Sequence, residues 1–194
     1  MGRKSELWGR LGGVRFRNRV RNYDYAFFVG YAFSEPKSVR EQRRNQLFWS
    51  TLSKWVQSLP RRCIPIILLD GNCTVGLDSD GAHVSEHLPD DCHIVGKDNP
   101  QPTTWQGEQL LDFCGQSDLA IANTFQGGSG TNRFGNRIDY IFIEQRRIQD
   151  LKVVRVDVEL ERRIRHTPKR VDHYPVFLHL QIVRKLQNLQ YQQY

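Results

Sequence analysis

Apolar side chains recur along the chain in patterns that predict several β-strands. From Gly13 to Arg21 arginines alternate with apolar residues, the period of a strand with one apolar and one basic face. The aromatic run from Tyr25 to Phe33 follows closely, so the two segments predict a hairpin that turns around Asn22 and Tyr23. The run from Ile64 to Leu69 is apolar throughout, as in a strand covered on both faces. Four later apolar runs predict further strands: Leu119 to Ala122, Arg137 to Ile143, Leu151 to Leu160 and Val176 to Ile182.

Two segments have the spacing of amphipathic helices. Ser38 and Glu41 have the spacing of a capping box, which predicts that a helix begins there. A second helix is predicted from Gln106 to Cys114, ending at Gly115. The apolar stripe of the first helix continues until Pro60 and contains Phe48, Leu52, Trp55, Val56 and Leu59.

The order of these elements indicates the fold class. Residues 73 to 103 are polar and punctuated by Gly and Pro, which predicts a long loop. Helices and strands alternate only loosely, and the later strands run consecutively. We therefore expect an α+β layered sandwich, not a doubly wound parallel sheet.

Length and composition are typical of one soluble globular domain. The chain has 194 residues, of which 39% are hydrophobic and 25% charged. We assign residues 1–183 to the domain and the polar residues 184–194 to a C-terminal tail. No run approaches the roughly 18 apolar residues that span a bilayer, and the N-terminus lacks the apolar stretch of a secretory signal. We expect an intracellular protein with no membrane contact, and nothing in the sequence predicts a protein partner.

The net charge of +7 is distributed unevenly along the sequence. Residues 1–62 carry 14 basic and 4 acidic side chains, residues 63–139 carry 3 and 11, and residues 140–194 carry 11 and 6. Basic segments attract polyanions, whereas clustered carboxylates repel them unless a cation lies between. This pattern favours nucleic acid and a divalent metal as ligands; solvated surface charge is the alternative explanation.

Cysteine and histidine spacing gives only weak evidence for other chemistry. The four cysteines form no CxxC pair, which is typical of reduced intracellular thiols. A group of possible zinc ligands lies in the predicted loop, where Gly, Asp and Pro disfavour a helix, so we assign no zinc site to it. The group contains His83, His87, Cys92 and His93.

Polar clusters stand directly at the ends of four predicted strands. They contain Tyr31, Asp70 with Asn72, Asp139, and the pair Asp172 and His173. Each one alone has a structural explanation, because Asp after a strand is common in turns and a single Tyr or His is common in cores. Their repeated placement at strand ends predicts a catalytic site.

The motifs around these residues resemble the endonuclease/exonuclease/phosphatase superfamily of DNase I-like nucleases, and within it the endonuclease domains of LINE-type retrotransposons. The resemblance covers about Gly9 to Ile182 and rests on five segments in a fixed order: GYAFSEP, PIILLDGN, GEQLLDFCGQSDLAIANTF, RIDYIFI and VDHYPVFLHL. It implies a four-layer α/β/β/α sandwich and a phosphodiester hydrolase that uses Mg²⁺ or Mn²⁺ and binds nucleic acid, with DNA favoured. Nuclear action is implied only by this resemblance.

The resemblance also implies roles for the strand-end residues. Tyr31 would contact the scissile phosphate, and Asp70 and Asn72 would position and activate the attacking water. Asp139 would orient His173, which either stabilises the phosphorane charge or acts as general base. The metal would be bound by Asp172. Basic side chains expected to contact nucleic acid are Arg15, Arg17, Arg19, Arg21, Arg163, Arg165, Lys169 and Arg170.

The sequence departs from the superfamily pattern in several places. Leu69 and Gly71 flank Asp70 where the usual form is GDxN, and Val171 precedes Asp172 where Ser is common. The stretch 127–136 lacks the Trp that many relatives carry. No strand with a catalytic Asn, and none with a metal-binding Glu, precedes Gly13, so we expect the fold to be incomplete at the N-terminus. Two other functions stay open: a catalytically inactive remnant that binds nucleic acid, and a phosphatase of the same superfamily.

Overall fold

The first two strands form the predicted antiparallel hairpin. In the computed structural model β1 (Leu11–Asn18) pairs with β2 (Tyr23–Tyr31) along its whole length. The structure describes residues 7–18, 23–76, 94–127, 129–160 and 172–181. The turn predicted around Asn22 therefore falls partly outside the described residues. β1 begins two residues before Gly13, and β2 ends two residues before Phe33.

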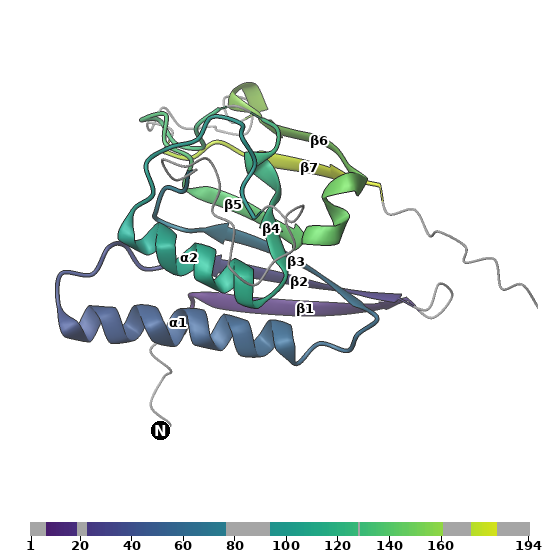
Figure 1. Cartoon of the computed structure of the whole chain (residues 1–194), viewed down its shortest axis with the longest axis horizontal. Helices are drawn as coiled ribbons and strands as arrows, with labels where there is room; N and C mark the ends of the chain where they lie inside the picture. The colour runs from purple at the N-terminus through teal and green to yellow at the C-terminus, as the bar shows by residue number, and fades with distance from the viewer. Residues whose placement is uncertain (1–6, 19–22, 77–93, 128, 161–171, 182–194) are drawn as a thin grey trace, which may run out of the picture.

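A mixed five-stranded sheet forms the centre of the fold (Figure 1). β3 (Cys63–Asp70) lies parallel to β2, and β5 (Asp139–Glu144) lies antiparallel between β3 and the short β4 (Leu119–Ile121). The strand order is β1-β2-β3-β5-β4. Because the ends of β2 and β3 and the beginning of β5 share one edge, polar residues far apart in sequence meet there. The prediction of an α+β fold is confirmed.

Both predicted helices are present and cover one face of this sheet (Figure 1). α1 (Val39–Gln57) begins after Ser38, whose hydroxyl accepts a hydrogen bond from the backbone of Glu41. α2 (Trp105–Gln116) continues past Gly115 instead of ending there, and its last turn is capped at Ser117. Two 3₁₀ segments, η1 (Ala122–Thr124) and η2 (Gln145–Asp150), follow β4 and β5.

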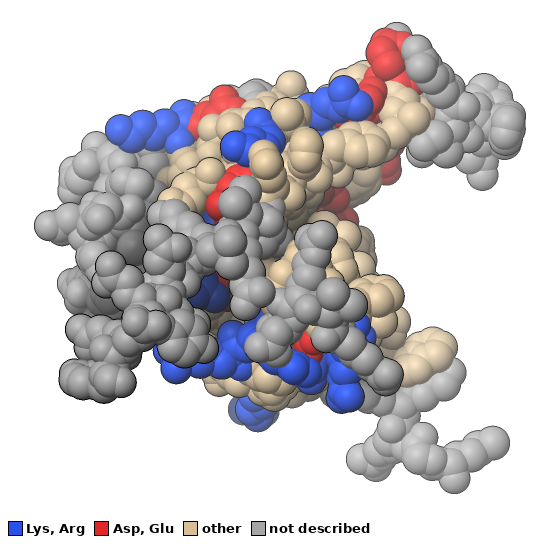
Figure 2. All heavy atoms as spheres, turned by 90° about the vertical axis from the view of Figure 1, so that its right-hand side faces the viewer, with Lys and Arg blue, Asp and Glu red and all other residues tan. Residues whose placement is uncertain are grey.

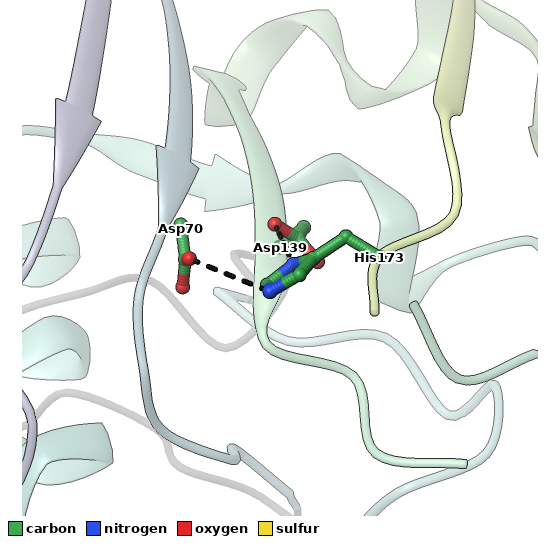
Figure 3. A group of neighbouring side chains, drawn as sticks. All are labelled: Asp70, Asp139 and His173. Atoms are coloured by element: carbon green, nitrogen blue, oxygen red, sulfur yellow. Dashed lines mark hydrogen bonds and ion pairs between the residues drawn. The ribbon is translucent and has the colours of Figure 1, made fainter. Parts of the chain in front are cut away.

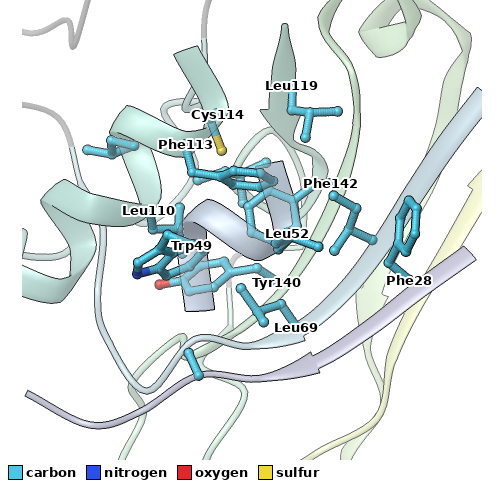
Figure 4. Packing of buried hydrophobic residues seen from close by; sticks show 14 of the residues in the cluster. Phe28, Trp49, Leu52, Leu69, Leu110, Phe113, Cys114, Leu119, Tyr140 and Phe142 are labelled. Carbon is cyan, nitrogen blue, oxygen red and sulfur yellow. The ribbon is translucent and has the colours of Figure 1, made fainter. Parts of the chain in front are cut away.

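The main core lies between the helices and the sheet (Figure 4). Phe48 and Leu52 of α1 are fully buried, as the helical stripe predicts. Phe113 of α2 contacts the ring of Trp49 on one side and that of Phe142 on the other, with centroid separations of 5.6 and 6.2 Å. Aromatic packing of this kind fixes the sheet against the helices and so fixes the edge that carries the polar residues.

A second, two-stranded sheet packs on the opposite face, so the described residues form three layers (Figure 1). β6 (Leu151–Val156) and β7 (Val176–Leu180) pair antiparallel and cover the β5 side of the main sheet. The prediction that β6 continues to Leu160 is wrong. Asp157 accepts a hydrogen bond from the N–H of Leu160, and helical backbone begins at residue 158.

The apolar face of β1 is not buried in the core. Val14 and Phe16 are 51% and 56% exposed, whereas Arg15 lies on the helix side of the sheet. The second sheet leaves the β1–β2 side of the main sheet open, and a groove of about 470 Å³ separates Phe27 and Leu68 from β7. Figure 2 shows the hollow between the two layers from the end at which the hairpin turns.

The long predicted loop is described only at its two ends. Residues 77–93 lie outside the described residues, and with them His83, His87, Cys92 and His93, the group of possible zinc ligands. The ends are joined where Thr104 donates its N–H to the carbonyl of Thr74, at 3.1 Å. The cysteines of the described part carry free, buried thiols: Cys63, Cys73 and Cys114. Among the described helices, none combines the length and apolar character needed to cross a bilayer.

Candidate active site

Three of the predicted residues lie side by side at one edge of the main sheet. Tyr31 ends β2, and its register partner on β3 is Asp70. Asp70 in turn pairs with Asp139, the first residue of β5. Strand register alone therefore places an aromatic hydroxyl and two carboxylates in a row across neighbouring strands.

His173 reaches this row from the segment that leads into β7 (Figure 3). Its Nδ1 lies 3.0 Å from Oδ2 of Asp139 and 3.2 Å from Oδ1. Its Nε2 lies 4.0 Å from Oδ2 of Asp70, so the imidazole lies between the two carboxylates. A carboxylate at Nδ1 orients the ring, and it leaves Nε2 facing the site.

Asp70 is held by the backbone turn that follows β3. The N–H of Asn72 donates to Oδ1 of Asp70 at 3.0 Å, which is the geometry of an Asx turn. Asn72 has a φ of 48°, a conformation that Asn tolerates, and its side chain turns back to donate to the carbonyl of Ala32 at 2.9 Å. Burial raises the pKa of Asp70, with the charge of Asp139 acting in the same direction, while the Asn72 N–H and His173 oppose the shift.

Tyr31 is 47% exposed and stands beside a basic side chain that the sequence did not indicate. The guanidinium carbon of Arg10 lies 4.6 Å from the Tyr31 ring centroid and 4.3 Å from that of Phe33. Arg10 also donates to the carbonyls of Tyr31 and Ala32. It precedes β1 and enters the site only because β1 pairs with β2.

Asp172 lies apart from the row of catalytic candidates. Its side chain is 66% exposed and forms an ion pair with Arg133, with Nε 3.2 Å from Oδ1. In the described residues the group able to share a cation consists of Asp70, Asp139 and His173. The metal-binding role of Asp172 stays a prediction.

The described basic side chains on β1 lie far from this edge. Arg15 forms an ion pair with the buried Asp24. Asp24 is also the register partner of Arg17, and it lies at the end of β2 opposite to Tyr31. Their nucleic-acid contacts stay a prediction. The other basic candidates lie outside the described residues: Arg19, Arg21, Arg163, Arg165, Lys169 and Arg170.

Two buried polar residues that the sequence analysis did not identify position Asp139. Asn123 donates to the carbonyl of Asp139 at 2.8 Å and accepts from the N–H of Ile141 at 3.0 Å. The hydroxyl of Thr131 accepts from the N–H groups of Ile138 and Asp139, both at 3.0 Å. For Asn123 the available signal was its place directly after the apolar run 119–122, since buried polar residues need internal partners; no comparable signal marks Thr131.

The donor atoms at this edge fit a divalent cation. The group of Asp70, Asp139 and His173 offers one ligand atom each, all within 4.8 Å of one another. Two carboxylates supply the hard oxygen ligands that Mg²⁺ and Mn²⁺ prefer. Both oxygens of Asp139 face Nδ1 of His173 in the present geometry, so a cation held here would share Asp139 with the imidazole.

No protein-family model and no curated protein sequence matches the chain. Solved structures do. The endonuclease domain of TRAS1, a telomere-specific non-LTR retrotransposon, superposes with a TM-score of 0.54 at 17% identity over 89% of this chain. The 3′-5′ exonuclease NExo from Neisseria meningitidis gives 0.54 at 20% identity over 81%. An AP endonuclease from Archaeoglobus fulgidus gives 0.53 at 11% identity over 81%. The chain has the DNase I-like fold.

The chain matches only part of each of these solved structures. It spans 62% of the length of each of the three solved structures. At such low identities the likeness extends to the fold alone, so activity must be argued from the residues of this chain.

Proposed function

We propose that this chain is a phosphodiester hydrolase that acts on DNA with a divalent metal, as a retrotransposon-type endonuclease domain. The observation that carries the proposal is the arrangement of His173 between Asp70 and Asp139 at one edge of a DNase I-like sheet. Phosphodiester hydrolysis needs an activated water and positive charge near the phosphoryl oxygens. The two carboxylates and the imidazole offer both functions.

The proposed roles follow from the contacts of each side chain. Asp70, whose pKa burial raises, accepts a proton from the attacking water. Asp139 holds His173 through Nδ1, so Nε2 points toward Asp70 and donates to a phosphoryl oxygen. Tyr31, next to Asp70, contacts the same phosphate. Asp70 and Asp139 would hold the metal, which supplies charge neutralisation on the phosphoryl group when bound.

The structural neighbours and the sequence support both DNA as the substrate and the retrotransposon type. The structural neighbours include endonucleases and an exonuclease, and one neighbour is a 3′ phosphatase bound to a product DNA hairpin. The retrotransposon type is supported by the TRAS1 endonuclease domain and by the segments DFC (112–114) and NTF (123–125). The basic N-terminal third of the chain is compatible with a polyanionic substrate.

Nicking of supercoiled plasmid tests the proposal. We expect conversion to the open circle with Mg²⁺ or Mn²⁺ and none in EDTA. Asp70→Ala and His173→Ala should lower the rate by about 100-fold or more, the usual cost of removing one group that stabilises developing charge. Matched controls are Asp112→Asn, an exposed carboxylate on α2, and His179→Ala, an exposed imidazole on β7. Both should retain the parental rate.

Two outcomes would contradict the proposal. Cleavage that is independent of metal, or unchanged in both active-site variants, would rule out this mechanism. Plasmid binding without nicking by the parent chain would instead support the inactive, nucleic-acid-binding alternative.

A further inference from the structure

The groove between the two sheets is bordered by the whole length of β7. All five residues of this strand, Val176–Leu180, line it. Because successive side chains of a strand point to opposite faces, a groove that touches every residue lies along the edge of the strand. The other wall is apolar and belongs to the main sheet, with Phe27 on β2 and Leu68 on β3. The groove therefore joins a strand edge to an apolar sheet face.

The groove-facing edge of β7 presents backbone groups that can pair with another strand. Pro175 faces β6, because its carbonyl accepts from the N–H of Asp157 at 2.9 Å. Bonding direction alternates along an antiparallel ladder, so the N–H and C=O groups of Val176 and Leu178 point to the other edge. Among the described residues β7 pairs with β6 alone. Such an edge is a template for one more strand.

The apolar face beyond this edge continues an interface that the two sheets already form. β6 and β7 cover Ile143 of β5, which is fully buried. Farther along the main sheet, Leu68, Val29 and Phe16 are 41%, 52% and 56% exposed. Figure 2 shows this part of the sheet facing the hollow between the layers. A strand added to β7 would extend the existing contact between the sheets over these side chains.

We propose that the groove beside β7 binds an extended segment of another polypeptide chain, which adds to β7 as a strand and packs alternate apolar side chains on Phe27 and Leu68. In this mode, backbone hydrogen bonds supply affinity and alternate side chains supply specificity. The solved structures of this fold favour a polypeptide occupant, since the chain spans 62% of each and the rest of their length has no counterpart in it. Lys and Arg gather at the hairpin end of the hollow, which favours acidic residues beside the apolar ones (Figure 2). This interaction is separate from the proposed hydrolysis.

Binding of a labelled synthetic peptide tests the proposal. The peptide has about seven residues, the length of an ordinary strand, and alternates valine with threonine between terminal glutamates. Fluorescence anisotropy should show saturable binding to the parent chain. A matched peptide with N-methyl groups on alternate amides, which cannot donate to β7, should bind about tenfold more weakly or not at all. Binding of the first peptide should also slow hydrogen exchange of the Val176 and Leu178 amides, followed by NMR.

A pair of leucines with equal exposure supplies the matched variants. Leu68→Glu should weaken peptide binding by about tenfold, because the added strand would cover an unpaired carboxylate. Leu47→Glu changes a leucine on α1 that is also 41% exposed and lies outside the groove. This control should bind the peptide like the parent chain. The exchange measurement on the parent chain keeps the proposal testable if Leu68→Glu does not fold.

Four outcomes would overturn the inference. They are no peptide binding by the parent chain, equal affinity for the N-methylated peptide, equal effects of Leu68→Glu and Leu47→Glu, and unchanged exchange at Val176 and Leu178. A dimer of the parent chain in analytical ultracentrifugation that Leu68→Glu dissociates would assign the groove to a second copy, which also overturns it. The titrations contain EDTA and no nucleic acid, so their result is independent of whether the chain hydrolyses DNA.

Discussion

A buried carboxylate fixes the β1–β2 hairpin. The side chain of Asp24 is 1% exposed, and its Oδ2 contacts the guanidinium groups of both Arg15 and Arg62. Its Oδ1 accepts from the backbone N–H of Asn18 at 3.3 Å. The hydrogen bond from Arg15 lowers the pKa of Asp24, and Arg62 acts in the same direction. An arginine that the sequence assigned to nucleic acid thus has a structural partner inside the protein.

The stability of this hairpin should depend on pH. Because the folded-state pKa of Asp24 lies below its ordinary value near 3.9, ionised Asp24 stabilises the fold above that pH. The contribution is lost as the pH falls through the folded-state pKa. Asp24→Asn should therefore lower Tm at pH 7, and the difference from the parent should shrink below about pH 4. Thermal unfolding followed by circular dichroism between pH 3 and 7 measures this; a difference independent of pH would contradict it.

At the scale of elements, the capping motif before α1 shows how local sequence fixes a helix boundary. Ser38 accepts from the N–H of Glu41 at 3.3 Å, as the capping box predicts. The Glu41 carboxylate accepts from the N–H of Lys37, at 2.6 Å, one residue before the expected partner. α1 carries Phe48 and Leu52 into the main core, so its first turn sets the position of a large part of the sheet.

Removing this cap should destabilise the protein measurably. Ser38→Ala should lower the free energy of unfolding by about 1 kcal/mol, the typical cost of losing an N-cap hydroxyl. Ser50→Ala is the control, because Ser50 is exposed in the middle of α1 and bonds only within its own helix. Urea unfolding of both variants gives the comparison. Equal effects of the two substitutions would argue against the capping role.

At the scale of the whole molecule, the basic hairpin and the candidate active site lie at opposite ends of β2. Seven residue steps along β2 lead from Asp24, the register partner of Arg17, to Tyr31, which corresponds to about 23 Å. Figure 2 shows Lys and Arg gathered at the hairpin end. A nucleic acid bound at the site would have to be long enough to reach these charges.

The salt dependence of binding tests whether a bound nucleic acid reaches the basic hairpin. On a duplex of about 15 base pairs, which is longer than the 23 Å gap, log Kd should vary with log salt by about 0.9 per neutralised phosphate. Arg17→Gln should reduce that slope by about 1. Arg146→Gln, which removes an arginine paired with Glu144, should leave the slope unchanged. An unchanged slope in Arg17→Gln would confine the interface to the site edge.

The elements and the order of the catalytic candidates were predictable because they depend on short-range patterns. The strand before Asp70, the stripe of α1 and the hairpin each follow from residues that are neighbours in sequence. The resemblance in motifs likewise predicted the DNase I-like fold, which the solved structures confirm. The contact between Asp139 and His173, which the resemblance implied, is present at 3.0 Å.

The sequence by itself determined the order of the helices and strands, the α+β class and the set of polar residues at the strand ends. Tertiary structure decided which face of each strand is covered: alternation distinguishes two faces of β1 but does not say that Arg15 lies on the helix side and Phe16 outside. It also decided which long-range partners meet, because strand pairing brings Arg10 to Tyr31, and a β-bridge brings Asn132 to His173. Contacts of this kind depend on the packing of whole layers, which no local pattern encodes.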